Sequence, residues 1–296
     1  MTDAIETSNL TKDYGSGRGL FDLGLMVEEG AVLGYLGPNG AGKTTTIRLL
    51  MGMIRPTRGS ARIFGLDCQK DSVAVKRRVG FLPAELAQFG GLRGSEVVSY
   101  LGGLQGGVDA QLVSAIARRF DLDLGRRFRD YSTGNKKKLG ILLAFMGRPG
   151  LLILDEPTSG LDPLNQQEFY RLLEEARGDG ATVFLSSHVL SEVEHVCDRV
   201  GILRQGKLVR VAELEDLRDI HFHKVEAEFE GEPPVERLGR VEGLAQLERD
   251  GQRLRFTFRG RFETLVDALA GTGVANLTSH EPSLEEVFLA YYRDAG

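Results

Sequence analysis

The sequence predicts an α/β fold followed by a small α+β domain. Short apolar runs at residues 31–37, 151–157 and 181–187 each precede a polar or glycine turn and then a helical pattern. Buried parallel strands joined by crossover helices produce this alternation. Later in the chain, apolar residues instead alternate with charged ones, as in half-exposed antiparallel strands. We therefore predict one domain over residues 1–216 and a second over residues 217–296.

Length and composition suit two folded domains. With 296 residues the chain has room for about two domains of ordinary size. Hydrophobic residues make up 42% of the chain, enough to build real cores. The formal net charge of -5 argues against a surface for duplex nucleic acid, because such surfaces are usually strongly basic. We therefore predict no nucleic-acid partner.

One stretch of the first domain departs from the alternation of strands and helices. Residues 90–107 are rich in glycine, and residues 110–122 follow a helical pattern. We predict a mostly helical subdomain over about residues 85–135.

The second domain shows both kinds of element. Residues 224–231 and 253–260 alternate as strands do, and residues 262–273 read as a helix ended by glycine. Ser283 stands three residues before Glu286, a capping box that predicts a closing helix.

No segment looks like a membrane span or a secretion signal. The N-terminus lacks a basic start and an apolar core. The purest apolar runs, such as residues 139–147, are shorter than the roughly 18 residues that a span needs. We expect a cytosolic chain whose membrane contact runs only through a partner.

The two cysteines predict neither a disulfide framework nor a metal site, because Cys68 and Cys197 form no spaced cluster. Cys197 falls on one helical stripe with Leu190, Val193 and Val200. We expect it to be a reduced thiol in the core.

A phosphate-binding loop lies between a predicted strand and a predicted helix. The stretch "GPNGAGKTT" fits G-x-x-x-x-G-K-[ST], and a chance match is disfavoured by the flanking elements. Glycines let backbone N–H groups surround phosphate oxygens, Lys43 reaches the β and γ phosphates, and Thr44 can ligate Mg²⁺. The candidate binding residues are Gly37, Pro38, Asn39, Gly40, Ala41, Gly42, Lys43, Thr44 and Thr45.

Other candidate residues follow buried strands or turns. Asp155 and Glu156 end the run at 151–157, where Asp155 can hold Mg²⁺ and Glu156 can act on an attacking water. A solvated turn is the alternative for this pair. His188 follows the next strand and can contact a γ phosphate, although a lone His there is more often a helix residue. Tyr14 can stack on a base, with a plain turn residue as its alternative.

Taken in order, these residues resemble the ATP-binding subunits of ABC transporters. The resemblance runs from about residue 5 to 215. It includes "DYG" as the adenine-stacking loop, "GPNGAGKTT" as Walker A, "YSTGN" as the signature motif, "LLILDEP" as Walker B, "SGLD" as the D-loop and "SSH" as the switch histidine. It implies a P-loop NTPase fold with an ABC ATPase core, a helical subdomain and ATP hydrolysis with Mg²⁺ as cofactor.

The resemblance also explains a helix that starts beside three lysines. In the family, the signature binds the ATP held by a second copy, so Ser132 and Gly134 would grip the partner's γ phosphate and Asp162 would lie at the seam. ATP would then close a head-to-tail homodimer, and hydrolysis would reopen it. Lys137 and Lys138 are individually expected to belong to a solvated basic run.

The chain departs from the family pattern at two places. The signature has Thr133 and Asn135 where the family usually has Gly and Gln, changes that keep small polar character. Ala84 stands where the family has a Gln that reaches Mg²⁺ and water, which Ala cannot do. Glu85, the next residue, is a candidate substitute.

Further stretches resemble the subgroup that pairs with ABC-2 type exporter permeases. They are "DPLNQQEFYRLLEEAR", "HVLSEVEHVCDRVGIL" and "PSLEEVF". The resemblance implies a peripheral subunit at the cytoplasmic face of the cell membrane, with a separate permease touching the helical subdomain near Phe89 and Leu92.

Two other classes of protein fit the sequence less well. A soluble ABC ATPase acting on nucleic acid or ribosomes tends to have two nucleotide domains, coiled coils or zinc insertions, and the sequence shows none of these. A P-loop kinase or GTPase would not need the signature, and no guanine-reading motif is found.

Overall fold

The computed structural model describes residues 3–86, 88–215 and 223–280. Contacts divide the chain into two compact units, residues 1–214 and 215–296, and each unit is described by itself. Among the described residues, no helix is long and apolar enough to cross a membrane.

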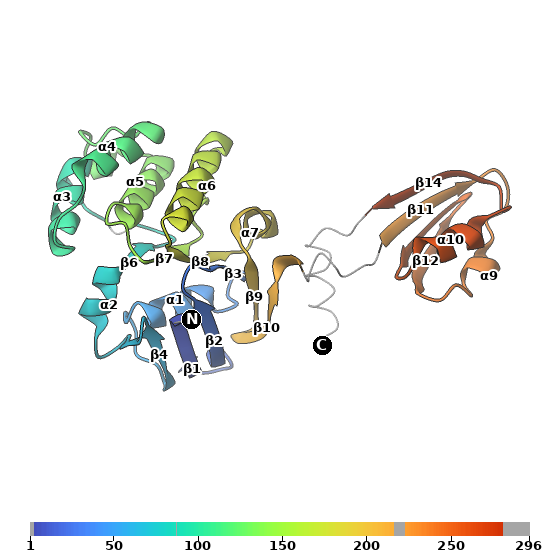
Figure 1. Cartoon of the computed structure of the whole chain (residues 1–296), viewed down its shortest axis with the longest axis horizontal. Helices are drawn as coiled ribbons and strands as arrows, with labels where there is room; N and C mark the ends of the chain where they lie inside the picture. Colours follow the sequence, from blue (N-terminus) through green and yellow to red (C-terminus); the bar gives the residue numbers. More distant parts are fainter. Residues whose placement is uncertain (1–2, 87, 216–222, 281–296) are drawn as a thin grey trace. The chain divides into compact units, whose positions relative to one another are not determined.

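A six-stranded sheet in the order β10-β9-β3-β8-β7-β6 organises the first unit (Figure 1). All neighbours are parallel except β10, which runs antiparallel to β9. The three predicted strands are confirmed as β3, β7 and β8, and every one of their residues is buried. The strands are β3 (Val32–Leu36), β6 (Val79–Leu82), β7 (Leu151–Asp155), β8 (Thr182–Ser187), β9 (Arg199–Arg204) and β10 (Lys207–Glu213).

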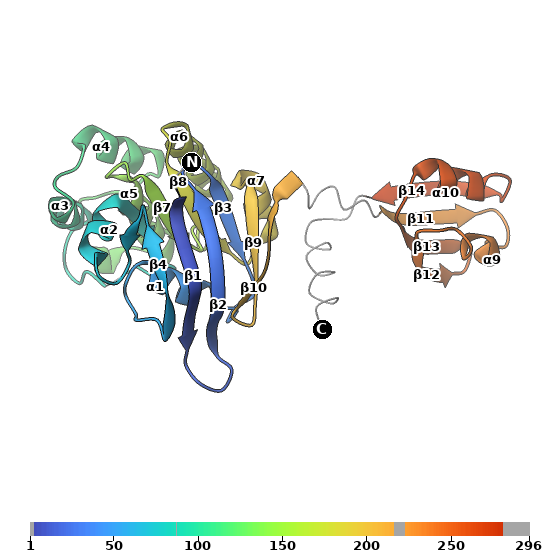
Figure 2. The ribbon, with the colours of Figure 1, turned by 60° about the horizontal axis from the view of Figure 1, so that its bottom comes forward.

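A second, antiparallel sheet lies at the start of the chain, and the sequence pattern did not predict it. Its order is β2-β1-β4-β5, and β1 and β2 form a long hairpin (Figure 2). Ile5 and Ile47 share one buried cluster with Tyr35 and Phe184 of the larger sheet, so both sheets and α1 enclose a common core. The elements are β1 (Asp3–Asp13), β2 (Gly19–Glu28), α1 (Lys43–Leu50), β4 (Arg58–Ile63) and β5 (Leu66–Asp67).

Helices gather beside β6 and β7 (Figure 1). Within 85–135, the structure has α3, α4 and a 3₁₀ turn, and then α5 packs against β6. The elements are α2 (Ser72–Arg78), α3 (Gly94–Leu104), α4 (Ala110–Arg119), η1 (Phe128–Asp130), α5 (Thr133–Phe145), α6 (Pro163–Gly178) and α7 (Leu190–Val196).

Both cysteines are free and buried. Burial raises the pKa of Cys68 to about 12 and raises the pKa of Cys197 as well. The core position expected for Cys197 is confirmed, but the helical stripe was wrong at its far end, because α7 ends at Val196 and Val200 lies on β9.

The second unit is a four-stranded antiparallel sheet in the order β12-β13-β11-β14. The two predicted strands and the predicted helix are confirmed as β11, β13 and α10. Phe229, Phe256 and Leu265 are among the residues of its core. The elements are β11 (His223–Phe229), α9 (Val235–Leu238), β12 (Leu244–Asp250), β13 (Arg253–Phe258), α10 (Phe262–Leu269) and β14 (Val274–His280). The helix predicted after Ser283 lies outside the described residues.

Candidate functional site

The glycine-rich loop joins β3 to α1 in a shape that requires glycine. Gly40 and Gly42 have φ values of 81° and 113°, in the left-handed region that other residues adopt at a cost. A Cβ at Gly37 would lie 2.6 Å from the Leu203 carbonyl oxygen. The Gly206 N–H donates to the Ala41 carbonyl over 2.8 Å, which ties the loop to the β9–β10 turn. The first N–H groups of α1, which have no partner within the helix, can therefore serve a phosphate.

Lys43 is the first residue of α1, and its side chain is only 6% exposed. Its ammonium donates to the Gly37 carbonyl oxygen over 2.6 Å and lies 3.3 Å from Glu156 Oε1. The loop thus curls around a cation that lies beside the carboxylate at the end of β7.

The side-chain oxygen atoms of Thr44 and Asp155 lie next to each other. The Thr44 hydroxyl donates to Asp155 Oδ2 over 3.1 Å, and the Ser186 hydroxyl donates to Oδ1 over 2.5 Å. Hard oxygen donors of this kind fit Mg²⁺. In the described part of the chain, no cluster of three or more His, Cys, Asp or Glu could hold a metal. A bound Mg²⁺ would complete its shell with phosphate oxygens and water, as it usually does.

Glu156 takes up a strained backbone conformation directly after β7. Its φ is 48°, in the left-handed region, which costs roughly 1–3 kcal/mol and is typical of functional positions. Its N–H donates to the Ser186 carbonyl over 3.1 Å, and its carboxylate is 17% exposed. Glu156 Oε2 lies 2.8 Å from His188 Nδ1. Lys43, Glu156 and His188 therefore form one contiguous chain of polar groups at the edge of the sheet.

A second layer of polar side chains lies beneath this edge, and the sequence motifs did not reveal it. Glu192 of α7 accepts a hydrogen bond from Ser187 Oγ over 2.7 Å and another from the Thr158 hydroxyl. It connects the segment after β7 to the segment before His188. The signal in the sequence was weak, since an acid on the first turn of a short helix is common.

The N-terminal end of α5 lies close to the loop before α6. Ser132 is the N-cap of α5, and its hydroxyl accepts from the Asn135 N–H over 3.2 Å. A Cβ at Gly134 would lie 3.2 Å from the Gly160 carbonyl oxygen, so any residue other than glycine would require a small shift of this neighbour. Asp162 is the N-cap of α6, and hydrogen bonds from Asn165 lower its pKa.

Lys137 is the one lysine of this helix for which the expectation of a solvated side chain was wrong. It is 6% exposed and donates to the main-chain oxygens of Ala84 over 3.3 Å and of Asp155 over 3.4 Å. Burial lowers its pKa to about 8, although neighbouring carboxylates oppose the shift. The helical period explains its place, because Lys137 lies one turn before the buried Gly140 and Ile141.

The structure does not bring every candidate into this cluster. Tyr14, 48% exposed, lies in the turn of the β1–β2 hairpin with Lys12 Nζ 5.5 Å from its ring centre. Glu85 is exposed, and none of the interactions found among the described residues joins it to Thr44 or Asp155. Phe89 is partly covered by an edge-on contact with Phe128, with ring centres 5.3 Å apart, and Leu92 is exposed.

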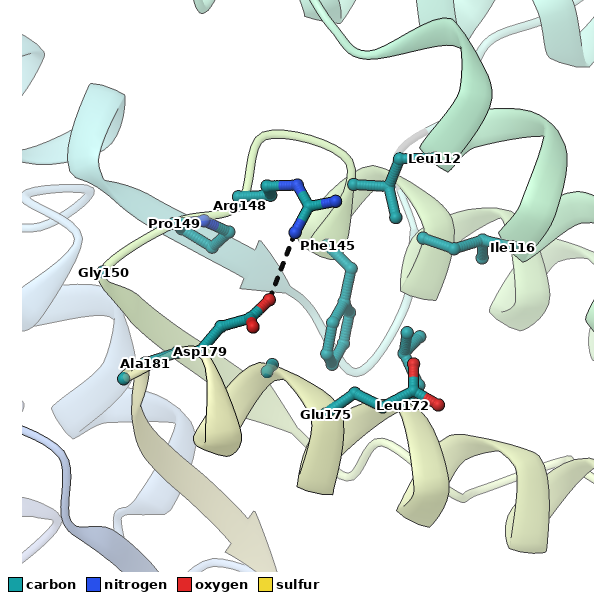
Figure 3. A pocket seen from close by; sticks show the side chains of 12 residues that line it. Leu112, Ile116, Phe145, Arg148, Pro149, Gly150, Leu172, Glu175, Asp179 and Ala181 are labelled. Carbon is teal, nitrogen blue, oxygen red and sulfur yellow. Dashed lines mark hydrogen bonds and ion pairs between the residues drawn. The ribbon is translucent and has the colours of Figure 1, made fainter.

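A cavity of about 430 Å³ opens elsewhere in the unit, between α4, the end of α5 and α6 (Figure 3). Leu112, Ile116 and Phe145 give it an apolar wall. Arg148 at its rim pairs with Asp179 over 3.1 Å. None of the candidate nucleotide residues lines it, so its chemistry is separate from that of the sheet edge.

Known proteins are similar to this chain in sequence and in fold. The family model described as "ABC transporter" matches residues 20–159. The bacitracin transport ATP-binding protein BcrA of Enterococcus faecalis is 38% identical over 220 residues, covering 73% of this chain and 71% of BcrA. The daunorubicin/doxorubicin resistance ATP-binding protein DrrA of Streptomyces peucetius is 32% identical over 308 residues, covering 98% of this chain and 92% of DrrA. A solved structure of an ATP-binding subunit of an ABC transporter is 29% identical, with a TM-score of 0.68 over 73% of this chain and 92% of that one.

Proposed function

Because the chain belongs to the ABC transporter family, as an ATP-binding subunit with ATPase activity, we propose that it drives an exporter. ATP closes two copies of the chain head to tail, and hydrolysis reopens them. A separate ABC-2 type permease carries the substrate outward. The observation that carries the proposal is the polar chain of Lys43, Glu156 and His188 beside the Thr44–Asp155 pair at one sheet edge.

Each of these side chains has a role in binding or hydrolysing ATP, and His188, which directly follows β8, contacts the γ phosphate. The loop from Gly37 to Thr45 surrounds the phosphates, and Lys43 neutralises charge on the β and γ groups. Glu156 orients or deprotonates the attacking water, since its carboxylate is close to Lys43 and His188 and only slightly exposed.

Thr44 and Asp155 are the residues that would hold Mg²⁺. When bound, Mg²⁺ supplies positive charge that stabilises the phosphate oxygens during transfer.

The N-terminal end of α5 is the part of the chain that we expect to contact a second copy. Ser132 is exposed, and the first turn of α5 carries no acidic residue. The Gly160 carbonyl lies so close to Gly134 that a Cβ there would crowd it. The helix dipole and its free N–H groups favour an anion at this end. We assign that place to the γ phosphate of ATP held by the partner, with Asp162 at the seam and Tyr14 against the adenine of its own ATP.

The assignment to an exporter rests on the relatives. BcrA is named for bacitracin transport and DrrA for daunorubicin and doxorubicin resistance, and the match to DrrA spans nearly the whole chain. The permease would meet the helical subdomain, where Leu92 is exposed and Phe89 partly so. The chain would then sit at the cytoplasmic face of the membrane through that permease alone.

Cell fractionation tests the transporter role against action on nucleic acid or ribosomes. A tagged chain in its own cells should sediment with membranes, be released by mild detergent and be unaffected by ribonuclease. Release by ribonuclease, with detergent having no effect, would contradict the assignment and favour a ribosome-associated or nucleic-acid-associated ATPase.

A further inference from the structure

Lys137 joins three segments of the first unit that are far apart in the sequence. The lysine lies on α5, five residues after the N-cap Ser132. Its ammonium donates to the Ala84 carbonyl, in the loop after β6, and to the Asp155 carbonyl, at the end of β7. Asp155 directly precedes Glu156, so this contact is one peptide away from the carboxylate beside Lys43.

The ammonium is held by main-chain oxygens rather than by an ion pair. No carboxylate of the described chain lies within 4.0 Å of it, although Asp155, Glu156 and Glu192 all attract it from farther away. A lysine side chain that is 6% exposed has lost most of its hydration, which is costly without close compensation. The two hydrogen bonds and the attraction of the carboxylates offset this cost, so we expect the net contribution of Lys137 to stability to be small, since buried charged groups can often be replaced by apolar side chains of similar volume.

The loop at Ala84 has no side chain that could make the same connection. Ala84 offers a methyl group, and Glu85 is exposed, with no interaction found between it and the site residues among the described positions. The ladder between β6 and β7 ends at the pair Leu82 and Leu154, and beyond that pair Lys137 connects the loop to the end of β7 by donating to the Ala84 and Asp155 carbonyls.

We propose that Lys137 is a positioning residue that fixes the peptide before Glu156 to the loop at Ala84 and to the N-terminal part of α5. This inference rests on the proposed role of Glu156 in activating water. Because α5 also carries Ser132 and Gly134, the same side chain connects the end of the helix offered to the partner's ATP with the hydrolytic carboxylate of its own chain. Lys137 acts through Glu156 and does not itself touch the nucleotide.

Steady-state ATP hydrolysis by the full-length Lys137→Met protein tests this positioning role, which we call the Lys137 tether. Met keeps the length and volume of the aliphatic stem but cannot donate to either carbonyl. We expect kcat to fall about 10- to 100-fold, the scale of a small misplacement of a reacting group, with KM for ATP changed less than about threefold. The melting temperature should stay the same or rise, since a buried charge is removed. Lys76→Met, which removes an exposed lysine of α2, should leave kcat unchanged.

A second variant separates the hydrogen bonds from the charge. Lys137→Gln retains an N–H donor without a positive charge, and we expect it to recover a large part of the lost kcat. It also keeps the test valid if Lys137→Met does not fold. In a Glu156→Gln background, adding Lys137→Met should cause little further loss, because the tether works through Glu156.

The outcomes are distinct. Normal kcat in Lys137→Met would overturn the tether while Glu156→Gln still loses turnover, leaving the proposed function intact. A lower melting temperature with matching losses of bound ATP and kcat would mean a purely structural role, and would also overturn it. Full turnover in Glu156→Gln would overturn the premise shared with the proposed function.

Discussion

At the residue scale, Lys43 and Glu156 lie in one cluster, but substitutions at these two positions should have different effects on ATP binding and hydrolysis. Lys43 is buried at the start of α1 and donates to the Gly37 carbonyl of the phosphate loop, so the proposed mechanism gives it a part in both ATP binding and phosphoryl transfer. Glu156 lies beside Lys43 and His188, and in the proposed mechanism it acts on the attacking water rather than on the phosphate.

We expect Lys43→Ala to abolish ATP hydrolysis, because it deletes a charge-assisted contact to the transferred phosphoryl group. Glu156→Gln should still bind ATP but hydrolyse it about a hundredfold or more slowly, the usual scale for loss of general-base help. Nucleotide binding by equilibrium titration and phosphate release by a coupled assay would separate the two effects. Normal turnover in Lys43→Ala would refute the assignment of the phosphate loop. Loss of ATP affinity in Glu156→Gln would move that residue to a structural or metal-binding role.

The sequence located the motif residues but not the contacts beneath them. Parallel strands deliver their carboxyl ends to one edge, so Asp155 and His188 could be placed together from the strand pattern. Lys137 was misjudged because three consecutive lysines look like a solvated run. The helical stripe that continues through Gly140 and Ile141 was the available signal, and it shows that position 137 faces inward.

At the element scale, regular patterns were predicted and irregular ones were not. The fully buried strands β3, β7 and β8 are short apolar runs bounded by turns, which makes them easy to recognise. β1 was not recognised, because shifts in its pairing register with β2 break the period of two on which a strand prediction depends.

Helix α4 offers a test of an individual element, because its N-terminus depends on one side chain. Asp109 Oδ1 accepts from the N–H groups of Gln111 over 2.8 Å and Leu112 over 3.2 Å. Asp109→Ala should lower the free energy of unfolding by about 1 kcal/mol, the usual cost of losing an N-cap. Chemical denaturation followed by far-ultraviolet circular dichroism would measure it.

A matched control for this helix cap is Glu174→Ala, which removes an exposed acid from the middle of α6. It should change the unfolding free energy by no more than about 0.5 kcal/mol. Equal effects of the two substitutions would show that the cap of α4 contributes nothing specific to stability.

At the scale of the whole molecule, every described candidate residue for ATP binding lies in the first unit. Within that unit, the phosphate loop and the α5 N-terminus have separate places in the sequence and different electrostatic roles. The first carries the buried Lys43 beside carboxylates, whereas the second has an exposed helix cap at Ser132 and no acid in its first turn. In the proposed mechanism a single copy holds ATP with the phosphate loop, and the α5 N-terminus binds the ATP of a second copy.

The solution mass of the Glu156→Gln protein, with and without ATP and Mg²⁺, tests this central claim most directly. Slow hydrolysis should trap the closed state, so ATP is expected to convert the monomer into a dimer. The same protein carrying Ser132→Arg should bind ATP and remain monomeric, because a bulky side chain then blocks the place of the partner's phosphate. A mass that stays monomeric at saturating ATP, or a dimer that forms equally well with Ser132→Arg, would contradict closure through the α5 N-terminus.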